Sequence, residues 1–312
     1  MARVDVLVYN NEEILEQRRL AMGYGCAYGK IILFGEHSVV YHQPAVALPF
    51  FDAKVEVWIQ TSQIDVIDSS LCKENNSHLL SFIQFIKKQL HLTDKYKITI
   101  ASTIPIGRGM GSSAAVVCAM TKAFFNEIQK TLPKQLLWEY VQYGEKIAHG
   151  NPSGIDTSVV TYEQPIYFIK EKVIQPLTIT TPLTLVVADT GEVGSTKEAV
   201  SKVAQQLPQK QHLINKMGLL ATTSLEYPQN VGNAMNSIHT CLQELQLSTP
   251  FIDCLVTAAQ QIGLGAKLTG SGLGGCVIAL AKNTLNAKQI QKEWTALGAK
   301  QTWTYTLEEQ HD

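Results

Sequence analysis

The sequence predicts a protein that mixes helices with strands and divides into two domains. Its 312 residues suit one large domain or two ordinary ones, and a hydrophobic content of 45% indicates a well-formed core. A strand, a glycine-rich turn and a helix follow one another between residues 96 and 128. A buried strand at 184–189 opens a second half, after a threonine-rich stretch bounded by prolines. We therefore expect domains at 1–182 and 183–312.

The composition excludes several function classes. The 26 Lys and Arg residues nearly balance the 27 Asp and Glu residues, so charge gives no general argument for a nucleic-acid or membrane partner. The 6 cysteines form no CxxC pair, which favours buried thiols of a reducing compartment over disulfides or zinc ligands. No stretch approaches the ~20 apolar residues of a membrane span, and residues 1–9 lack a signal-peptide core. We expect a cytoplasmic protein.

Apolar spacing predicts the individual elements. Residues 1–22 could hold a strand at 4–9 and a charged helix at 11–22, packed on the body, used for association, or only loosely held. The other expected strands lie at 31–34, 45–48, 53–59, 96–102, 184–189, 277–280 and 302–305. The other expected helices lie at 76–92, 114–128, 136–149, 195–203, 213–225, 233–247, 250–262 and 288–294.

The glycine-rich turn has the character of an anion cradle. Gly107, Gly109 and Gly111 alternate with larger residues, and Ser112 and Ser113 then lead into the helix. Glycine lets the backbone approach a ligand closely, and the free N–H groups and dipole of a helix start attract phosphate. Either serine could cap the helix, and a serine hydroxyl could also bind Mg²⁺. The alternative is an ordinary strand-to-helix turn.

Two better-known glycine motifs do not fit this turn. A Walker loop needs a Lys-Ser or Lys-Thr pair after its last glycine, and none is present. The dinucleotide fingerprint is met only in its relaxed form, by Gly109, Gly111 and Ala114. That fingerprint also needs an acid at the end of a second strand, whereas Glu127 lies inside the expected helix. We set both interpretations aside.

Charged residues flank two other segments. Lys30 stands at the start of a buried strand, and Glu36 and His37 stand just beyond its end. Glu145 and Asp156 lie on either side of an Asn-Pro-Ser-Gly turn that could bring Asp156 back toward the cradle. Two carboxylates near a phosphate suit one metal ligand and one base. The alternatives are solvated strand flanks, a solvated helical glutamate and an aspartate in a cap or turn.

Three motifs together resemble a known superfamily. They lie in the same order as in the galactokinase, homoserine kinase, mevalonate kinase and phosphomevalonate kinase superfamily, at 29–41, 105–115 and 267–276. The Gly-Glu-His element in the first motif and the segment 150–156 are most similar to the mevalonate kinase branch. Galactokinases continue that element with Thr-Asp-Tyr, and homoserine kinases lack it. The motifs frame residues 25–280, which is most of the chain.

The resemblance implies a fold and an activity. The fold would be an α+β, two-domain small-molecule kinase fold, with an N-terminal mixed-sheet nucleotide-binding domain, a C-terminal ferredoxin-like domain and an active site in the cleft. The activity would be ATP-dependent phosphorylation of the C5 hydroxyl of mevalonate, giving 5-phosphomevalonate and ADP for isoprenoid precursor synthesis. Mg²⁺ would be the cofactor. Mevalonate and ATP would be the partners, without nucleic acid or membrane, and a homodimer is left open.

The resemblance also implies residue roles. Asp156 matches the catalytic base, and Lys30 matches the lysine that contacts both that base and the reacting hydroxyl. Ser113 and Glu145 match the Mg²⁺ ligands. The implied ATP-binding residues are Lys30, Pro105, Gly107, Arg108, Gly109, Met110, Gly111, Ser112, Ser113 and Ala114. The implied substrate-binding residues are Glu36, His37, Asp156 and Thr196.

The chain departs from the family pattern at three places. Tyr28 stands where the family has proline, so the turn before Lys30 is less rigid. Arg108 replaces a small residue of the glycine loop and could contact a phosphate or face solvent. Ser271 and Leu273 replace alanine and glycine in the third motif.

Two other functions remain open at this point. One is a sibling kinase acting on phosphomevalonate or another small alcohol. A phosphorylated acceptor would need more cationic side chains than Lys30 and His37 near the first motif. The other is a non-catalytic sensor on the same fold, which would be expected to lack the base or a metal ligand.

Overall fold

A computed structural model describes residues 23–69, 77–150, 152–178 and 181–307. The strand and helix expected within residues 1–22 lie outside this part of the chain, as do Cys72 and Asn151. Within it, no helix combines the length and the apolar character that a bilayer crossing requires.

The described residues form two compact units. The first unit takes its residues from Met1–Gly29, Ala53–Ile104 and Gly111–Glu163. The second takes its residues from Lys30–Asp52, Pro105–Met110 and Gln164–Asp312. The chain therefore changes unit within its first two strands and again inside the glycine-rich turn. The expected domain boundary between residues 182 and 183 stays a prediction.

The first unit contains a mixed arrangement of strands. Its strands are the beginning of β1 (Gly23–Phe34), the end of β2 (Ala45–Ser62), β3 (Val66–Ser69) and β4 (Lys95–Ser102). β2 pairs antiparallel with β4 from Val55 onward, whereas β3 pairs parallel with β4. Apolar and polar residues alternate along β4, as expected for a sheet with one covered face.

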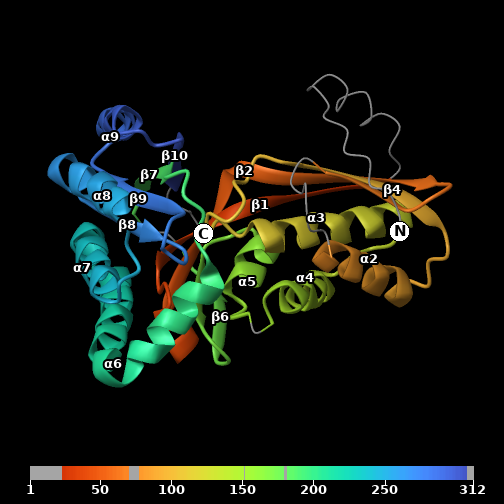
Figure 1. The fold of residues 1–312 in the computed structure, drawn as a ribbon, viewed down its shortest axis with the longest axis horizontal. Helices are drawn as coiled ribbons and strands as arrows, with labels where there is room; N and C mark the ends of the chain where they lie inside the picture. Colours follow the sequence, from red (N-terminus) through yellow and green to blue (C-terminus); the bar gives the residue numbers. More distant parts are fainter. Residues whose placement is uncertain (1–22, 70–76, 151, 179–180, 308–312) are drawn as a thin grey trace. The chain divides into compact units, whose positions relative to one another are not determined.

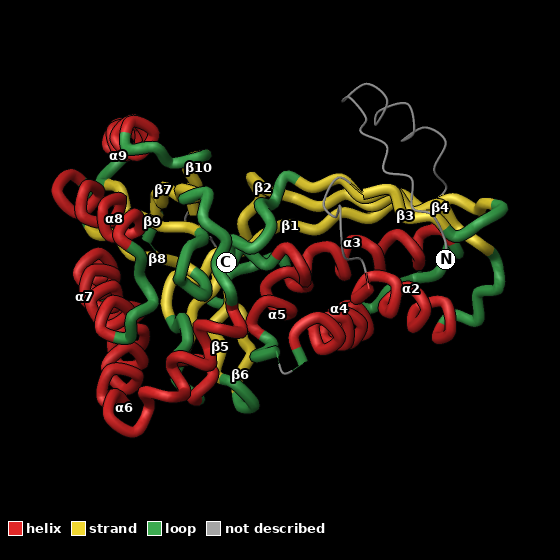
Figure 2. The backbone as a smooth tube through the Cα atoms, in the orientation of Figure 1, coloured by secondary structure: helices red, strands yellow, loops and turns green. Residues whose placement is uncertain are grey.

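Four helices complete the first unit. They are α2 (Ser77–Gln89), α3 (Ser112–Glu127), α4 (Lys134–His149) and α5 (Ile155–Tyr162). In Figure 2, α2, α3 and α4 lie on one side of β3 and β4. α3 is buried on nearly all sides, which its many small residues allow, and it packs against the other three helices. The sequence indicated three of these helices but not α5.

The second unit is built on a four-stranded antiparallel sheet. Its strands are β7 (Leu183–Asp189), β8 (Gly265–Thr269), β9 (Cys276–Ala281) and β10 (Gln301–Leu307), in the order β10-β7-β9-β8. Its helices are α6 (Thr196–Glu226), α7 (Val231–Glu244), α8 (Pro250–Ile262) and α9 (Thr284–Ala296). α8 and α9 pack on the sheet, and α7 lies beside β8 (Figure 1). This strand and helix order confirms the expected ferredoxin-like domain.

The remaining elements of the second unit extend its strands. β5 (Ile166–Ile169) pairs with the first residues of β2, and β6 (Val173–Pro176) pairs with β5. Two short 3₁₀ helices, Ser38–Tyr41 and Pro228–Asn230, complete the fold. The sequence analysis did not indicate β5 or β6, nor β3 and β8 described above.

Two pairs of elements expected from the sequence are each a single element, and β1 begins at Gly23 rather than at the expected residue 31. The strands expected at 45–48 and 53–59 are one strand, β2, with Pro49 inside it. β2 pairs with β5 before Pro49 and with β4 after it, so the missing N–H costs no bond to either strand. The helices expected at 195–203 and 213–225 are the two arms of α6, separated by a kink at Lys210 that follows Pro208.

Candidate functional site

The predicted phosphate cradle ends where helix α3 of the first unit starts. α3 begins at Ser112, with Gly111 as its cap at a φ of 72°. The expectation that Ser112 or Ser113 caps the helix is therefore wrong, because both residues already have helical backbone geometry. No side chain caps this helix, so N–H groups of its first turn have no side-chain partner at the cap. Such a turn is a suitable environment for an anion.

The two predicted metal ligands lie on adjacent helices of the first unit. The Ser113 hydroxyl oxygen is buried and has no hydrogen-bond partner among the described residues. Glu145, on α4, is 4% exposed, and one of its oxygens lies 3.9 Å from His149 Nε2. Gly144 allows α4 to approach α3, because a Cβ there would lie 2.6 Å from a methyl of Val117, one turn beyond Ser113.

Asp156 is positioned by a third helix of the first unit. It lies in the first turn of α5. The next residue, Thr157, donates to Gln142 of α4 across 2.7 Å, and Trp138 of α4 donates to Ser158 across 3.0 Å. These bonds fix α5 against the helix that carries Glu145. The three oxygen-bearing residues predicted for this unit therefore come from three packed helices.

Three predicted residues of the second unit, Lys30, Glu36 and His37, lie within the last part of β1 or just after it. Lys30 is 2% exposed, and its backbone N–H donates to Met110 of the glycine loop across 3.0 Å. His37 has a left-handed φ of 57°, and its Nε2 lies 2.8 Å from the carbonyl oxygen of Ser271. A carbonyl only accepts, so Nε2 carries the proton. Burial lowers the pKa of His37, which leaves Nδ1 of the neutral ring as an acceptor.

Glu36 has a partner that sequence reasoning missed. Its carboxylate is buried and accepts a hydrogen bond from Lys267 of β8, and both side chains are 0% exposed. Burial raises the pKa of Glu36, and Lys267 opposes that shift. The signal in the sequence was a lysine between apolar residues, at the start of the third motif. Its partner lies 231 residues away, so the pairing could not be read from local pattern.

Arg108 is held by protein oxygens. Its Nε donates to Asp189 across 2.6 Å, and its Nη2 donates to the Gly191 carbonyl across 2.7 Å. The arginine is 6% exposed, so the alternative in which it faces solvent is wrong. A phosphate contact stays a prediction, and it would have to compete with these bonds. Asp189, at the end of β7, is a second residue that the sequence did not single out.

The glycine loop packs closely on two other segments of the second unit. The Gly107 carbonyl accepts from Gly194 across 3.0 Å. A Cβ on Gly109, whose φ is 72°, would lie 3.0 Å from the Cα of Gly270 in the third motif. Thr196 is exposed at the start of α6, where the Ser195 side chain caps the helix. The glycine loop therefore packs against the segment around residue 194 and against the third motif, and both contacts fix its backbone conformation.

The predicted site residues are thus shared between the units. Ser113, Glu145 and Asp156 belong to the first unit, and Lys30 and Glu36 belong to the second. Within the described residues, no cluster of three His, Cys, Asp or Glu side chains is arranged to hold a metal ion. A magnesium site built from one hydroxyl, one carboxylate and nucleotide oxygens does not need such a cluster. The convergence of Lys30 with Asp156 stays a prediction.

Similarity to known proteins decides the family. The GHMP kinases N terminal domain matches residues 77–164, and the GHMP kinases C terminal domain matches residues 225–300. The mevalonate kinase of Pyrococcus horikoshii is 33% identical over 294 residues, covering 82% of this chain and 87% of the relative. This chain belongs to the GHMP kinases. The mevalonate kinase of Archaeoglobus fulgidus is 32% identical over 267 residues, covering 82% of this chain and 91% of the relative.

Solved structures of GHMP kinases share the fold. The L. major mevalonate kinase in complex with R-mevalonate has a TM-score of 0.81 at 26% identity, covering 92% of this chain and 96% of that one. The Methanococcus jannaschii mevalonate kinase has a TM-score of 0.80 at 26% identity, covering 94% and 100%. The expected α+β kinase fold and the expected resemblance to mevalonate kinases are confirmed. The chain is a kinase.

Proposed function

We propose that this GHMP kinase transfers the γ-phosphoryl group of ATP to the C5 hydroxyl of mevalonate. The products are 5-phosphomevalonate and ADP, which places the reaction in isoprenoid precursor synthesis. The relatives described above carry the name of this activity, and one structural neighbour holds R-mevalonate. The proposal keeps the cytoplasm as the compartment, leaves a homodimer open, and includes no nucleic-acid or membrane partner.

The observation that carries the proposal is the buried, unpartnered hydroxyl of Ser113. Buried polar groups in native proteins are nearly always hydrogen-bonded, so this hydroxyl is available to a ligand at the helix start. With Glu145 on the adjacent helix it offers two hard oxygen donors, which suit Mg²⁺ when phosphate oxygens and water complete the octahedron. When bound, Mg²⁺ supplies charge neutralisation for the phosphate oxygens.

The protein residues then position the reactants and move one proton. Backbone N–H groups of the glycine loop and of the α3 start bind the phosphates. Asp156 accepts the proton of the acceptor hydroxyl while the bond from that oxygen to the γ-phosphorus forms. The bond from the γ-phosphorus to the bridging oxygen breaks, and ADP leaves. The proposal requires Lys30 to meet Asp156 and the hydroxyl, where its charge would lower the pKa of the hydroxyl.

The choice of acceptor can be tested directly. We expect an assay of ADP release to show a clear preference for mevalonate over phosphomevalonate, galactose and homoserine. A preference for any of the other three would overturn the substrate assignment and leave the family unchanged. Turnover with none of them would favour the sensor alternative.

The proposed base can be tested with Asp156→Asn. A positioned base contributes ~10²–10⁴-fold in rate, so kcat should fall by at least about a hundredfold while KM for ATP changes little. Asp94→Asn, at an exposed position of the same unit, is the matched control and should keep wild-type kcat. Near-normal turnover by Asp156→Asn would remove Asp156 from this role.

A further inference from the structure

The third motif of this chain contains a fully buried lysine. Lys267 lies on β8, and its ammonium donates to a Glu36 oxygen, to the Leu268 carbonyl across 3.0 Å and to the Ile32 carbonyl across 3.4 Å. Neither the lysine nor the glutamate side chain is exposed to solvent. A buried ion pair is rarely needed for stability, because well-packed apolar residues of the same volume often serve as well. Burial of the pair is therefore not in itself evidence that the pair serves stability.

The glutamate of this pair has one carboxylate oxygen that accepts no hydrogen bond among the described residues. Its Oε1 is occupied by Lys267, whereas its Oε2 is buried and has no hydrogen-bond partner among the described residues. A buried carboxylate oxygen without a donor is costly, and native proteins rarely leave one in that state. A hydroxyl group of a bound molecule would supply the missing donor.

We propose that Lys267 is a positioning residue for the acceptor site: it holds Glu36 as an oriented carboxylate whose Oε2 accepts a hydrogen bond from a hydroxyl of the acceptor substrate. This inference rests on the proposed function and on the family resemblance, which implies that Glu36 binds the acceptor substrate. It gives the third motif a role in acceptor binding, in addition to its packing against the glycine loop.

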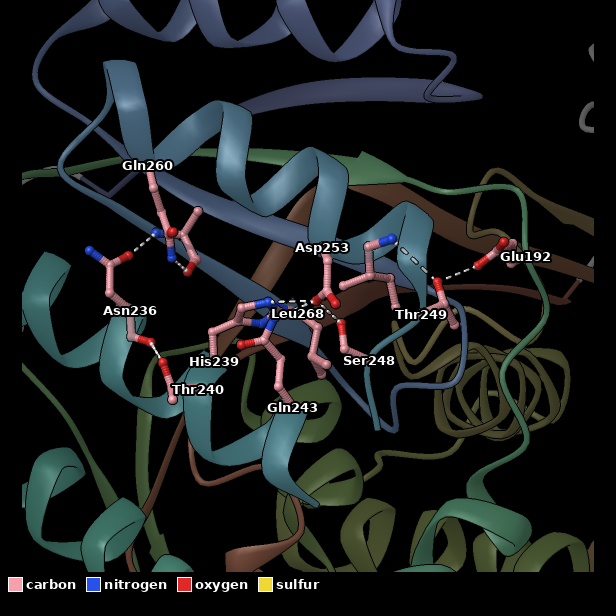
Figure 3. Close-up of polar contacts among 12 residues, drawn as sticks. Glu192, Asn236, His239, Thr240, Gln243, Ser248, Thr249, Asp253, Gln260 and Leu268 are labelled. Carbon is pink, nitrogen blue, oxygen red and sulfur yellow. Dashed lines mark hydrogen bonds and ion pairs between the residues drawn. The ribbon is translucent and has the colours of Figure 1, made fainter. Parts of the chain in front are cut away.

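The surrounding charges support this role. The pKa of Glu36 is raised above its usual value, because burial outweighs the opposing attraction of Lys267 and Lys30. Removing the Lys267 ammonium would therefore favour a protonated Glu36, which is a weaker acceptor. His37 is committed through Nε2 to the Ser271 carbonyl. His239 accepts from the N–H of Leu268, the residue after Lys267, and is directed through Nε2 toward Asp253, as Figure 3 shows.

A variant at Thr269 is the control that distinguishes the positioning of Glu36 by Lys267 from the attachment of β8 to β1. It lies two residues from Lys267 and so on the same face of β8. Its hydroxyl accepts from the Ile32 N–H across 3.1 Å and donates to the Ile32 carbonyl across 3.0 Å. Thr269→Val thus removes side-chain bonds to the same residue of β1 that Lys267 contacts, and leaves the charge of Glu36 untouched.

The experiment measures kcat/KM for the acceptor between pH 5.5 and 9 in the full-length protein. In Lys267→Met, KM for the acceptor should rise about ten- to hundredfold at neutral pH, which corresponds to one hydrogen bond to a charged group. The acid limb of the profile should move to higher pH, and activity should recover as pH rises through the raised pKa of Glu36. KM for ATP should stay nearly constant, and Thr269→Val should lower stability without moving the limb.

A second pair of variants covers a Lys267→Met protein that fails to fold. Glu36→Gln and Glu36→Gln/Lys267→Met carry no carboxylate at position 36, and the two should show the same raised KM for the acceptor. A further loss in the double variant would mean that Lys267 acts independently of Glu36, and would overturn the proposal. So would an unmoved acid limb in folded Lys267→Met.

The test is kept separate from the proposed function. The acceptor used is whichever compound the wild type phosphorylates best, so a preference for a different alcohol sinks the mevalonate assignment alone. A readout without turnover is the ionisation of Glu36, followed by ¹³C NMR of glutamate-labelled protein and assigned with Glu36→Gln. An unchanged titration of Glu36 in Lys267→Met would overturn the positioning role, whatever the substrate.

Discussion

Two buried ion pairs in the second unit differ in what they leave open. Arg108 and Asp189 have side chains 7% and 3% exposed, and Asp189 Oδ1 also accepts from the Gly191 N–H across 2.8 Å. Among the described residues, neither Asp189 oxygen is a buried acceptor without a partner. The Lys267–Glu36 pair is buried as deeply but leaves Oε2 of Glu36 unpartnered.

The difference separates two uses of buried charge. The Arg108 pair joins the glycine loop to the turn after β7, and the protein itself uses its donors and acceptors. The Lys267 pair keeps one acceptor for a molecule that is not part of the chain. The first pair should therefore matter most for stability, and the second most for acceptor binding.

The largest effect on stability is expected from Arg108→Met. Removing one partner of a buried ion pair leaves the other charge uncompensated, which costs about 3–5 kcal/mol of unfolding free energy. Urea unfolding followed by circular dichroism measures this loss. Arg108→Met/Asp189→Asn removes both charges and should recover most of it.

The same double variant tests whether the two ion pairs differ in their effect on acceptor binding. If the Arg108 pair serves only to hold the loop, its neutral replacement should keep KM for the acceptor near that of the wild type. The Glu36→Gln/Lys267→Met variant should instead raise that KM. Equal effects of the two neutral replacements on acceptor binding would contradict the distinction between the pairs.

A smaller effect on stability is expected from Gly109→Ala. This variant tests whether close packing against Gly270 helps to hold the glycine loop in place. Gly109 has a φ of 72° and approaches Gly270, whereas Gly150 has a φ of 78° and, among the described residues, no neighbour within 4 Å of the place that a Cβ would take. The left-handed backbone costs alanine about 1–2 kcal/mol at either position. Overlap with Gly270 should add about 1–3 kcal/mol at Gly109 only. Equal losses of unfolding free energy in the two alanine variants would show that the close approach carries no weight.

Local pattern was enough to predict the motifs of the proposed site but not the partners of their side chains. The glycine loop, the Lys30 strand and most of the helices could be predicted because their signals lie within a few adjacent residues. Arg108 and Asp189 are 81 residues apart, and Lys267 and Glu36 are 231 apart, so only the tertiary fold reveals that they pair. Arg108 could accordingly be interpreted from sequence only as a phosphate contact or a solvated residue.

Backbone geometry limited the prediction in a second way. The serines after the glycine loop have the composition of a helix cap, but a left-handed Gly111 takes the cap position and places both inside the first turn. That one-residue shift leaves the Ser113 hydroxyl free of a capping bond. Sequence propensity could not distinguish these arrangements, because serine and glycine are both accepted at a cap.

The smallest effect concerns His239, which accepts a hydrogen bond from Leu268, the residue after Lys267. Its Nδ1 accepts from the Leu268 N–H across 3.4 Å and its Nε2 donates to Asp253 across 3.1 Å, as drawn in Figure 3. Gln243 and Ser248 donate to the same Asp253 oxygen. Burial lowers the pKa of His239, although Asp253 opposes the shift. The neutral ring is therefore the form that the folded protein favours.

The sign of the pH effect follows from that direction. A histidine whose pKa is lowered on folding contributes stability in full above its unfolded pKa of about 6.5, and loses it as pH falls through the folded value. Protonation also removes the acceptor for Leu268, next to Lys267, at about 1 kcal/mol for one hydrogen bond. His239→Gln cannot titrate, so the difference in Tm between wild type and variant should shrink from pH 7.5 to 5.5. Burial lowers the pKa of His37 and His78 too, so only this difference isolates His239, and a constant difference would mean that His239 is neutral throughout that range.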